Sequence, residues 1–317
     1  MEFSKFMLKI LFFGSFQHYS ALILDALVQD KNLNVIGVVT TPPKPAGRKQ
    51  ELKKTEVQLY AEQHQLPIFT PESLKSTSPS SIINTPFELI VTAGYGKILP
   101  KSWMQAPKFG ALNLHFSLLP KYRGANPAEW AILMGETETG ITLIEMSEKL
   151  DAGGILAQAK IPIYNSDTRE TLYQKLYELG AQKLPFWLIN YLNYKNHSII
   201  QSFSHELTLP PVAQPLASPT PYAKRLKRED GFIDWKKIND ALNSNQKTSE
   251  IITRSVRALS DFPGVWTLVP TKSGEKRMKI LSCEMNRDDK LELKRVQFEG
   301  QNEATWNQVK NQLSNGS

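Results

Sequence analysis

Short apolar runs alternate with amphipathic stretches through the first half of the chain, and this alternation constrains the fold more than any other feature. A repeated strand–helix order predicts an α/β fold with an open, mostly parallel, Rossmann-like sheet and helices on both faces. Apolar residues recur at helical spacing over Tyr19–Gln29. A second predicted helix begins after Thr55, whose side chain can cap it. The runs with the length and composition of buried strands are Leu8–Phe13, Val35–Val39, Leu89–Thr92 and Ala111–His115.

The pattern changes after about residue 200. Five prolines occur between Leu209 and Pro221, which predicts an extended segment over the surface. Beyond it, short strand-like runs separated by Gly and charged turns predict a smaller, OB-like β-barrel. We therefore expect an α/β domain over residues 1–205, a linker over 206–223 and a barrel over 224–317.

Composition and charge narrow the class of protein. The excess of 38 Lys and Arg over 31 Asp and Glu gives a net charge of +7, which favours a polyanionic partner without requiring one. The single cysteine, Cys283, excludes an internal disulfide and a cysteine-based metal cluster. No apolar run has the roughly 20 residues of a membrane helix, and the N-terminus does not resemble an Arg-rich leader. We expect a monomer in a bacterial cytoplasm, without a membrane partner.

The first predicted strand ends in a turn with one glycine, Gly14–His18. The glycine-rich patterns that cradle nucleotide phosphates are absent from this turn. A dinucleotide cofactor is therefore not expected here, and we interpret His18 as a polar residue at a helix start.

Two polar residues stand at the end of the fourth predicted strand. Asn113 and His115 are two positions apart, so their side chains share one face, at the edge where open parallel sheets bind ligands. An amide beside an imidazole can hydrogen-bond an oxygen that becomes negative during acyl transfer, although a polar strand end can also merely cap a turn. Asp151, in the stretch Asp151–Gly154, either pairs with His115 or accepts backbone N–H groups in its own turn.

Together these segments resemble a known family. The order H-x-S-L-L-P-x-x-R-G-x-x-P, a helix, G-E-T-E-T-G-I-T and L-D-x-G is similar to that of the tetrahydrofolate-dependent formyltransferases, with the same spacing over Asn113–Gln158. The resemblance implies that Asn113, His115 and Asp151 are catalytic, that 10-formyltetrahydrofolate is the co-substrate and that no metal takes part. It also implies a folate pocket lined by Tyr95, Gly96, Lys97, Ile98, Leu99, Ser117, Leu118, Leu119 and Pro120.

One residue departs from the family pattern. Phe116 stands where related enzymes usually carry glycine. Because Phe116 lies between His115 and Ser117, we expect its side chain to point away from Asn113 and His115.

Two basic segments indicate which molecule accepts the formyl group. The loop over residues 41–54 carries five Lys and Arg residues and resembles the insertion loop of family members that formylate methionine on initiator tRNA. Residues 222–235 resemble the junction that precedes the second domain of the same proteins. A flexible basic loop suits the phosphates of a tRNA acceptor stem. The resemblance implies tRNA binding by Arg48, Lys49, Lys53, Lys54, Lys224, Arg225 and Lys227.

The expected reaction is therefore formyl transfer to the methionine α-amine on charged initiator tRNA. One alternative is an enzyme that formylates a nucleotide-linked amino sugar on the same catalytic core, which would not need the basic loop. A second alternative is a catalytically silent RNA-binding protein on this fold, against which the intact set of Asn113, His115 and Asp151 argues.

Overall fold

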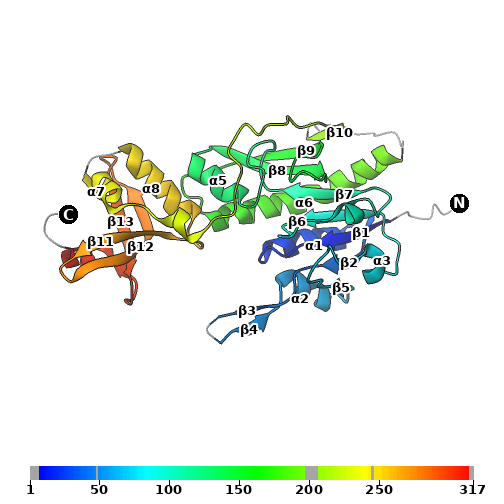
Figure 1. The fold of residues 1–317 in the computed structure, drawn as a ribbon. Helices are drawn as coiled ribbons and strands as arrows, with labels where there is room; N and C mark the ends of the chain where they lie inside the picture. Colours follow the sequence, from blue (N-terminus) through cyan, green and yellow to red (C-terminus); the bar gives the residue numbers. More distant parts are fainter. Residues whose placement is uncertain (1–6, 48, 197–205, 244–245, 314–317) are drawn as a thin grey trace. The chain divides into compact units, whose positions relative to one another are not determined.

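The computed structural model describes residues 7–47, 49–196, 206–243 and 246–313, and these residues form two compact units (Figure 1). The first unit joins Met1–Ala125, Thr139–Ile161 and Tyr173–Tyr222. The second joins Asn126–Glu138, Pro162–Leu172 and Ala223–Ser317. The C-terminal unit thus includes two segments that lie within the predicted 1–205 domain.

An eight-stranded sheet in the order β10-β9-β8-β7-β6-β1-β2-β5 forms the centre of the first unit. The five strands from β7 to β5 run parallel, while β8 pairs antiparallel with β7. This confirms the predicted open, mostly parallel sheet. The strands are β1 (Leu8–Phe13), β2 (Leu33–Val39), β5 (Ile68–Phe69), β6 (Leu89–Ala93), β7 (Ala111–His115), β8 (Glu138–Glu145), β9 (Ile155–Pro162) and β10 (Leu207–Val212).

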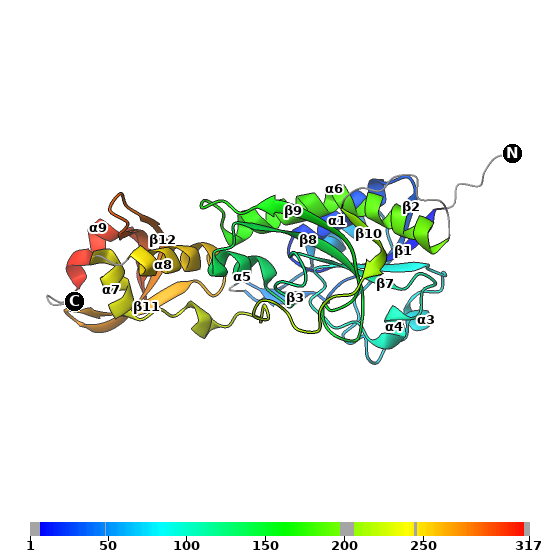
Figure 2. The same ribbon diagram turned by 90° about the horizontal axis from the view of Figure 1, so that it is seen from above.

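Helices cover both faces of this sheet. Helices α1 (Tyr19–Gln29) and α6 (Arg169–Lys195) lie on one face, and α3 (Pro79–Ile82) and α4 (Lys101–Met104) lie on the other (Figure 2). A Cβ built on Gly180 of α6 would lie 2.8 Å from Leu114 and 2.9 Å from Ile23, so α6, β7 and α1 are in direct contact. Alternate residues of β7 therefore face opposite layers.

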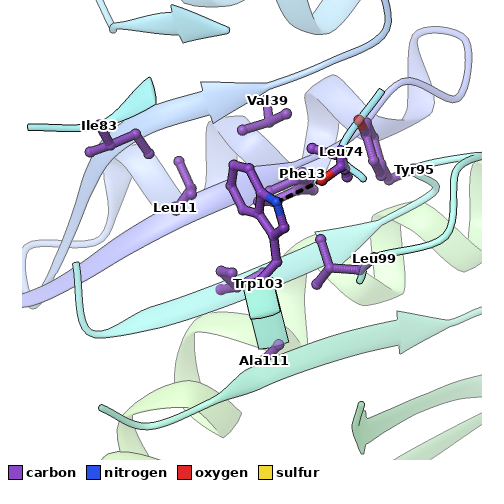
Figure 3. Close-up of a cluster of buried hydrophobic side chains, with 10 residues drawn as sticks. Leu11, Phe13, Val39, Leu74, Ile83, Tyr95, Leu99, Trp103 and Ala111 are labelled. Atoms are coloured by element: carbon purple, nitrogen blue, oxygen red, sulfur yellow. Dashed lines mark hydrogen bonds between the residues drawn. The ribbon is translucent and has the colours of Figure 1, made fainter. Parts of the chain in front are cut away.

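The layer opposite α6 is a cluster of buried side chains around Trp103 of α4 (Figure 3). Trp103 packs edge-on against Phe13, with 5.7 Å between ring centroids, and its indole N–H donates to the Leu74 carbonyl at 3.1 Å. Ala111 of β7 belongs to the same cluster. The side chains of Asn113 and His115, two and four positions further along β7, accordingly share the face of Ala111.

A hairpin and a short helix lie between β2 and β5 along the chain. Strands β3 (Lys44–Ala46) and β4 (Glu51–Lys53) form an exposed hairpin within the basic loop. Helix α2 (Glu56–Gln63) follows, and the Thr55 side chain accepts the Gln58 N–H at 3.0 Å as a helix cap. The predicted helix start is confirmed.

The stretch predicted as a linker, residues 206–223, contains a strand of the sheet. Leu207 of β10 pairs with Ala157 of β9, and Thr208 Oγ1 donates to the Ile155 carbonyl at 3.0 Å. After β10 the chain continues as an extended segment without helix or strand up to Tyr222.

The second unit combines an antiparallel sheet with helices. Its strands pair in the order β11-β12-β13-β14, and an isolated bridge joins Thr271 to Leu313. The described pairings leave β11 and β14 at the two edges of the sheet, so a closed barrel stays a prediction. The elements are α5 (Pro127–Met134), η1 (Arg228–Gly231), α7 (Trp235–Asn243), α8 (Gln246–Ala258), β11 (Val265–Thr271), β12 (Gly274–Met285), β13 (Leu291–Phe298), β14 (Ala304–Thr305), α9 (Trp306–Val309) and η2 (Lys310–Gln312).

Candidate active site

The structure brings together the three residues predicted to be catalytic. Asn113 and His115 end β7, and Asp151 lies in the loop that follows β8, the antiparallel neighbour of β7. Asn113 Nδ2 donates to Asp151 Oδ1 at 3.4 Å, and His115 Nδ1 lies 3.6 Å from Asp151 Oδ2. The His115 and Asp151 side chains are 6% and 8% exposed, so both groups are largely shielded from water.

Asp151 lies beside His115, which is the first of the two roles that the sequence left open, and the backbone N–H that it accepts comes from outside its own turn. Its carboxylate faces His115, and its Oδ2 also accepts the Gly124 backbone N–H at 2.9 Å. Asp151 adopts a left-handed φ of 51°, which aspartate tolerates better than most residues. The loop passes so close to β8 that a Cβ on Gly153 would lie 1.7 Å from the Glu145 carbonyl oxygen, so only glycine fits there.

The hydrogen bonds of His115 fix its tautomer. His115 Nε2 lies 3.0 Å from the Tyr122 carbonyl oxygen, and a carbonyl can only accept, so Nε2 carries a proton. Nδ1 then faces the Asp151 carboxylate, which can accept a proton held there. Each ring nitrogen therefore has an acceptor beside it.

Thr92 orients Asn113 and was not identified from the sequence. Its hydroxyl donates to Asn113 Oδ1 at 2.6 Å, which directs Nδ2 towards Asp151. Thr92 pairs with Asn113 in the parallel register of β6 and β7. A hydroxyl at the end of the neighbouring strand was the available signal, but it becomes informative only once the strand order is known.

Phe116 points away from the site, as predicted. Its ring stacks on Tyr177 of α6, with 3.7 Å between centroids, on the face opposite His115. Phe16, in the turn after β1, stacks on the same tyrosine at 6.0 Å. Aromatic side chains thus occupy the layer between this turn and α6.

The predicted folate loop after β6 is partly buried. Tyr95 packs edge-on against Phe13 at 5.1 Å, and Leu99 belongs to the Trp103 cluster (Figure 3). Burial raises the pKa of Tyr95 to about 12, and its buried hydroxyl has no hydrogen-bond partner among the described residues. Lys97 Nζ donates to the Pro71 and Glu72 carbonyls at 2.9 Å each.

The same loop also presents groups to its surface. Ile98 is 77% exposed, and Gly96 has open space where a side chain would begin. The loop thus combines a buried anchor with an exposed apolar tip.

The second predicted folate segment, Ser117–Pro120, forms a turn held by a local hydrogen bond and by side chains of β8 and β9. The Ser117 hydroxyl donates to the Lys121 carbonyl at 2.7 Å, and Thr142 Oγ1 donates to the Ser117 carbonyl at 2.6 Å. Gln158 Nε2 donates to the Leu119 carbonyl at 2.8 Å. The side chains of Ser117 and Leu119 are buried, so they contribute to the rigidity of the turn.

A cavity of about 660 Å³ opens where β7 begins and β8 ends, and its lining includes none of the predicted folate residues. Met146 connects it to the candidate site, because Met146 Sδ lies 3.9 Å from the Thr92 hydroxyl that holds Asn113. The lining residues do not include Asn113, His115 or Asp151. They are Lys101, Met104, Gln105, Pro107, Lys108, Phe109, Gly110, Ala111, Glu145, Met146, Ser147, Glu148, Tyr191 and Lys195.

Within the ranges that the structure describes, no cluster of three His, Cys, Asp or Glu side chains is arranged to hold a metal ion. In the same ranges, no helix combines the length and the apolar character needed to cross a membrane.

The residues predicted to bind tRNA have different surroundings. Lys53 lies 3.6 Å from Glu56, and Lys54 lies 2.8 Å from Glu62, so both cations are paired with nearby carboxylates. Lys49 is exposed in the hairpin, and Arg48 lies outside the described residues. Their role in tRNA binding stays a prediction.

In the second unit, Lys224 pairs with Asp230 at 2.7 Å. The Lys227 backbone N–H donates to the same carboxylate at 2.8 Å, while the side chains of Arg225 and Lys227 are exposed. The described structure therefore leaves two of these three junction cations open to a partner.

Comparison with known proteins shows relatives that cover most of this chain. Residues 8–188 match the family model described as formyl transferase. A methionyl-tRNA formyltransferase of Staphylococcus epidermidis is 38% identical over 278 residues, which cover 87% of this chain and 80% of that protein. A methionyl-tRNA formyltransferase of Listeria welshimeri is 38% identical over 267 residues, covering 84% and 77%.

Solved structures show the same fold. A 4-N formyltransferase from Francisella tularensis superposes with a TM-score of 0.58 at 16% identity, covering 84% of this chain and 94% of that one. An N-formyltransferase from Helicobacter canadensis, solved with folinic acid and dTDP-3-aminofucose, gives 0.55 at 19%, covering 88% of each chain. On the family match and the identity to these relatives, the chain belongs to the formyl transferase family.

Proposed function

We propose that this protein is a methionyl-tRNA formyltransferase, which moves the formyl group of 10-formyltetrahydrofolate to the α-amine of methionine on charged initiator tRNA. The observation that carries the proposal is the convergence of Asn113, His115 and Asp151 at the end of β7. The relatives of that name support it, since they match more than four fifths of the chain. Charged initiator tRNA is used where translation begins, so we expect the protein to act in the cytoplasm. We also expect it to be a monomer.

Asn113 and His115 can stabilise the oxyanion of the tetrahedral intermediate. Asn113 Nδ2 uses one hydrogen for Asp151, which leaves its second hydrogen for the formyl oxygen as the amine adds to the formyl carbon. His115 Nδ1 can donate to the same oxygen only when the ring carries a proton on both nitrogens, because Nε2 already donates to the Tyr122 carbonyl. The Tyr122 carbonyl holds the ring in this orientation.

Asp151 can move the proton that the reaction displaces. The attacking amine must lose a proton, and the Asp151 carboxylate accepts it directly or through one water. The carbon–nitrogen bond to tetrahydrofolate then breaks, and the leaving nitrogen takes that proton. The hydrogen bonds from Asn113 and Gly124 position the Asp151 carboxylate for this proton transfer.

The cavity beside Met146 is a suitable site for the formyl donor. Its volume of about 660 Å³ lies in the usual range for small-molecule pockets. Met104 and Met146 offer apolar surface to a flat ring system, and Lys108 offers charge to a carboxylate tail, while Lys101 is already paired with Glu148. The exposed Ile98 adds apolar surface on the neighbouring loop.

The exposed hairpin favours tRNA over a small acceptor. Among the described residues, Lys44 and Lys49 of this hairpin form no ion pair, so their charge is available to phosphates. The structure from Helicobacter canadensis with dTDP-3-aminofucose keeps an amino-sugar acceptor as the alternative, although at 19% identity the likeness concerns the fold alone.

A direct assay tests the proposal. The purified protein is given 10-formyltetrahydrofolate and either charged initiator tRNA or an amino-sugar nucleotide, and the formylated product is quantified. We expect transfer to the tRNA and at least about 100-fold lower kcat/KM for the sugar, the size of difference that distinct acceptor contacts produce. Preferential transfer to the sugar would show that the acceptor is an amino-sugar nucleotide. No transfer to either acceptor would favour the catalytically silent RNA-binding protein.

A further inference from the structure

The extended segment after β10, residues 214–220, makes unusually many polar contacts with the candidate site. It carries little apolar packing, since Leu216 is 94% exposed. Two of its residues, Pro215 and Pro219, restrict the unfolded chain and so lower the entropic cost of an extended form. Hydrogen bonds rather than burial therefore define where this segment lies.

Gln214 holds the loop that carries Asp151. Its Nε2 donates to the Asp151 carbonyl at 3.0 Å and to the Gly153 carbonyl at 2.7 Å. These two bonds fix the backbone on both sides of Ala152. Because Asp151 has a left-handed φ, its loop depends on such contacts to stay in place.

Arg123 fixes Gln214 in turn. Gln214 Oε1 accepts from Arg123 Nε at 3.1 Å and from Nη2 at 2.9 Å. Arg123 also donates to the Pro215 and Leu216 carbonyls, at 2.8 and 3.4 Å. The arginine is 6% exposed, so its guanidinium and the amide of Gln214 define one rigid arrangement.

The other end of the segment supports His115. Thr220 Oγ1 accepts the Tyr122 backbone N–H at 2.7 Å, and Ser218 Oγ donates to the Pro120 carbonyl at 2.8 Å. The Tyr122 carbonyl, in turn, accepts from His115 Nε2. Tyr122 has a left-handed φ of 56°, so its peptide orientation needs an external contact of this kind.

We propose that residues 214–220 form a positioning element that orients both Asp151, through Gln214, and His115, through Thr220 and Tyr122. The expected effect on the reaction rate depends on the proposed function. A displacement of about 1 Å between reacting groups can cost about 100-fold in rate. The segment touches neither the cavity lining nor the basic hairpin in the described contacts, and its described hydrogen bond to the predicted folate turn runs from Ser218 to Pro120. Substitutions at Gln214 and Thr220 leave that donor in place, so substrate affinity should be largely unaffected.

Isosteric variants separate the individual contacts. Gln214→Glu keeps an acceptor for Arg123 but loses the donor to Asp151 and Gly153. Thr220→Val removes the acceptor for Tyr122 with little change in volume, and Thr220→Ser restores a hydroxyl. Thr208→Val is the matched control, because Thr208 also bonds a backbone carbonyl across the sheet but contacts neither Asp151 nor Tyr122.

The variants are compared, as full-length protein, by kcat, by KM for both substrates, by thermal unfolding and by nitrogen NMR of the His115 ring. We expect Gln214→Glu and Thr220→Val to lower kcat about 10–100-fold with KM within about twofold. Thr220→Val should also change the His115 ring signal. Thr220→Ser should restore both readouts, and Thr208→Val should alter neither.

Three results would overturn the inference: wild-type kcat with an unchanged His115 signal, a kcat loss that only follows the folded fraction, or an equal loss in Thr208→Val. If the wild-type protein transfers no formyl group, the proposed function fails. The His115 signal then decides the inference alone, because it is measured without substrate.

Discussion

Two buried arginines show how differently the two units use a cation. In the second unit, Arg169 donates to Glu129 at 2.8 Å and to Asp261 at 3.2 Å, and the Glu129 side chain is only 1% exposed. In the first unit, Arg123 is equally buried, but its described partners are the Gln214 amide and two backbone carbonyls, all of them neutral.

The two arginines differ in whether they pair with a carboxylate or leave a nearby carboxylate free to take part in proton transfer. The bonds of Arg169 join three chain segments into one unit, because Glu129, Arg169 and Asp261 come from different parts of the sequence. The amide of Gln214 stands between Arg123 and the loop of Asp151. The Asp151 carboxylate therefore forms no ion pair with an arginine among the described residues and stays beside His115.

The largest effect on activity is expected from Asp151→Asn. The substitution keeps the shape of the side chain but removes its charge and its ability to accept a proton. We expect kcat for formyl transfer to fall by about 10²–10⁴, with little change in thermal unfolding. Asp261→Asn is the control in the other unit, and its kcat should stay near that of the wild type. Near-normal turnover of Asp151→Asn would exclude this carboxylate from proton transfer.

The largest effect on stability is expected from Glu129→Ala. It leaves the buried Arg169 without its closest carboxylate, which typically costs about 3–5 kcal/mol. The free energy of unfolding of the C-terminal unit, followed by Trp fluorescence in urea, measures this loss. Glu170→Ala removes a half-exposed partner of the same arginine and should cost about 1 kcal/mol or less. Equal losses of unfolding free energy in the two variants would show that the Glu129–Arg169 pair contributes no more to stability than a surface pair.

A smaller, acceptor-specific effect is expected from Arg48→Ala, in the basic loop. Loss of one phosphate contact should weaken binding of charged tRNA and reduce the salt slope of binding by about one unit. Binding of the formyl donor should not change, because the loop is not part of the cavity lining. Lys31→Ala, an exposed cation in another turn, serves as the control. If donor and tRNA binding fall together, the loop supports the fold instead.

The smallest effect concerns Tyr222, which follows residues 214–220. Burial raises the pKa of Tyr222, and the negative charge of Asp151 raises it further, because a nearby carboxylate disfavours the phenolate. Removing that charge in Asp151→Asn should lower the pKa of Tyr222 while leaving it above the ordinary value. An ultraviolet titration that compares wild type with Asp151→Asn, each against its Tyr222→Phe variant, isolates this residue. An unchanged pKa would mean that Asp151 lies too far away or is not ionised.

Local patterns predicted the open parallel sheet and the positions of Asn113 and His115, but they left the pairing of Asp151 with His115 open. Period and length predicted β1, β6 and β7, and the alternation along β7 placed Asn113 and His115 on one face. The same alternation predicted that Phe116 points the other way, where it meets Tyr177.

Contacts distant in sequence were not predictable in this way. Gln214 bonds the Asp151 carbonyl 63 residues away, and Thr220 bonds Tyr122 98 residues away. Nothing in a proline-rich stretch indicates such partners, so residues 206–223 resembled a linker. Thr92 is a similar case, because its contact with Asn113 depends on the pairing of β6 with β7.

Single-turnover formyl transfer to charged initiator tRNA tests the central claim most directly. The rate constant at saturating donor and excess enzyme is compared between the wild type and His115→Ala, with the Kd for tRNA measured in parallel. We predict a rate constant about 10²–10⁴ lower for His115→Ala and an unchanged Kd, because His115 acts on the reacting atoms and not on the tRNA body. Equal rate constants would contradict the assignment of Asn113, His115 and Asp151 as the site of transfer.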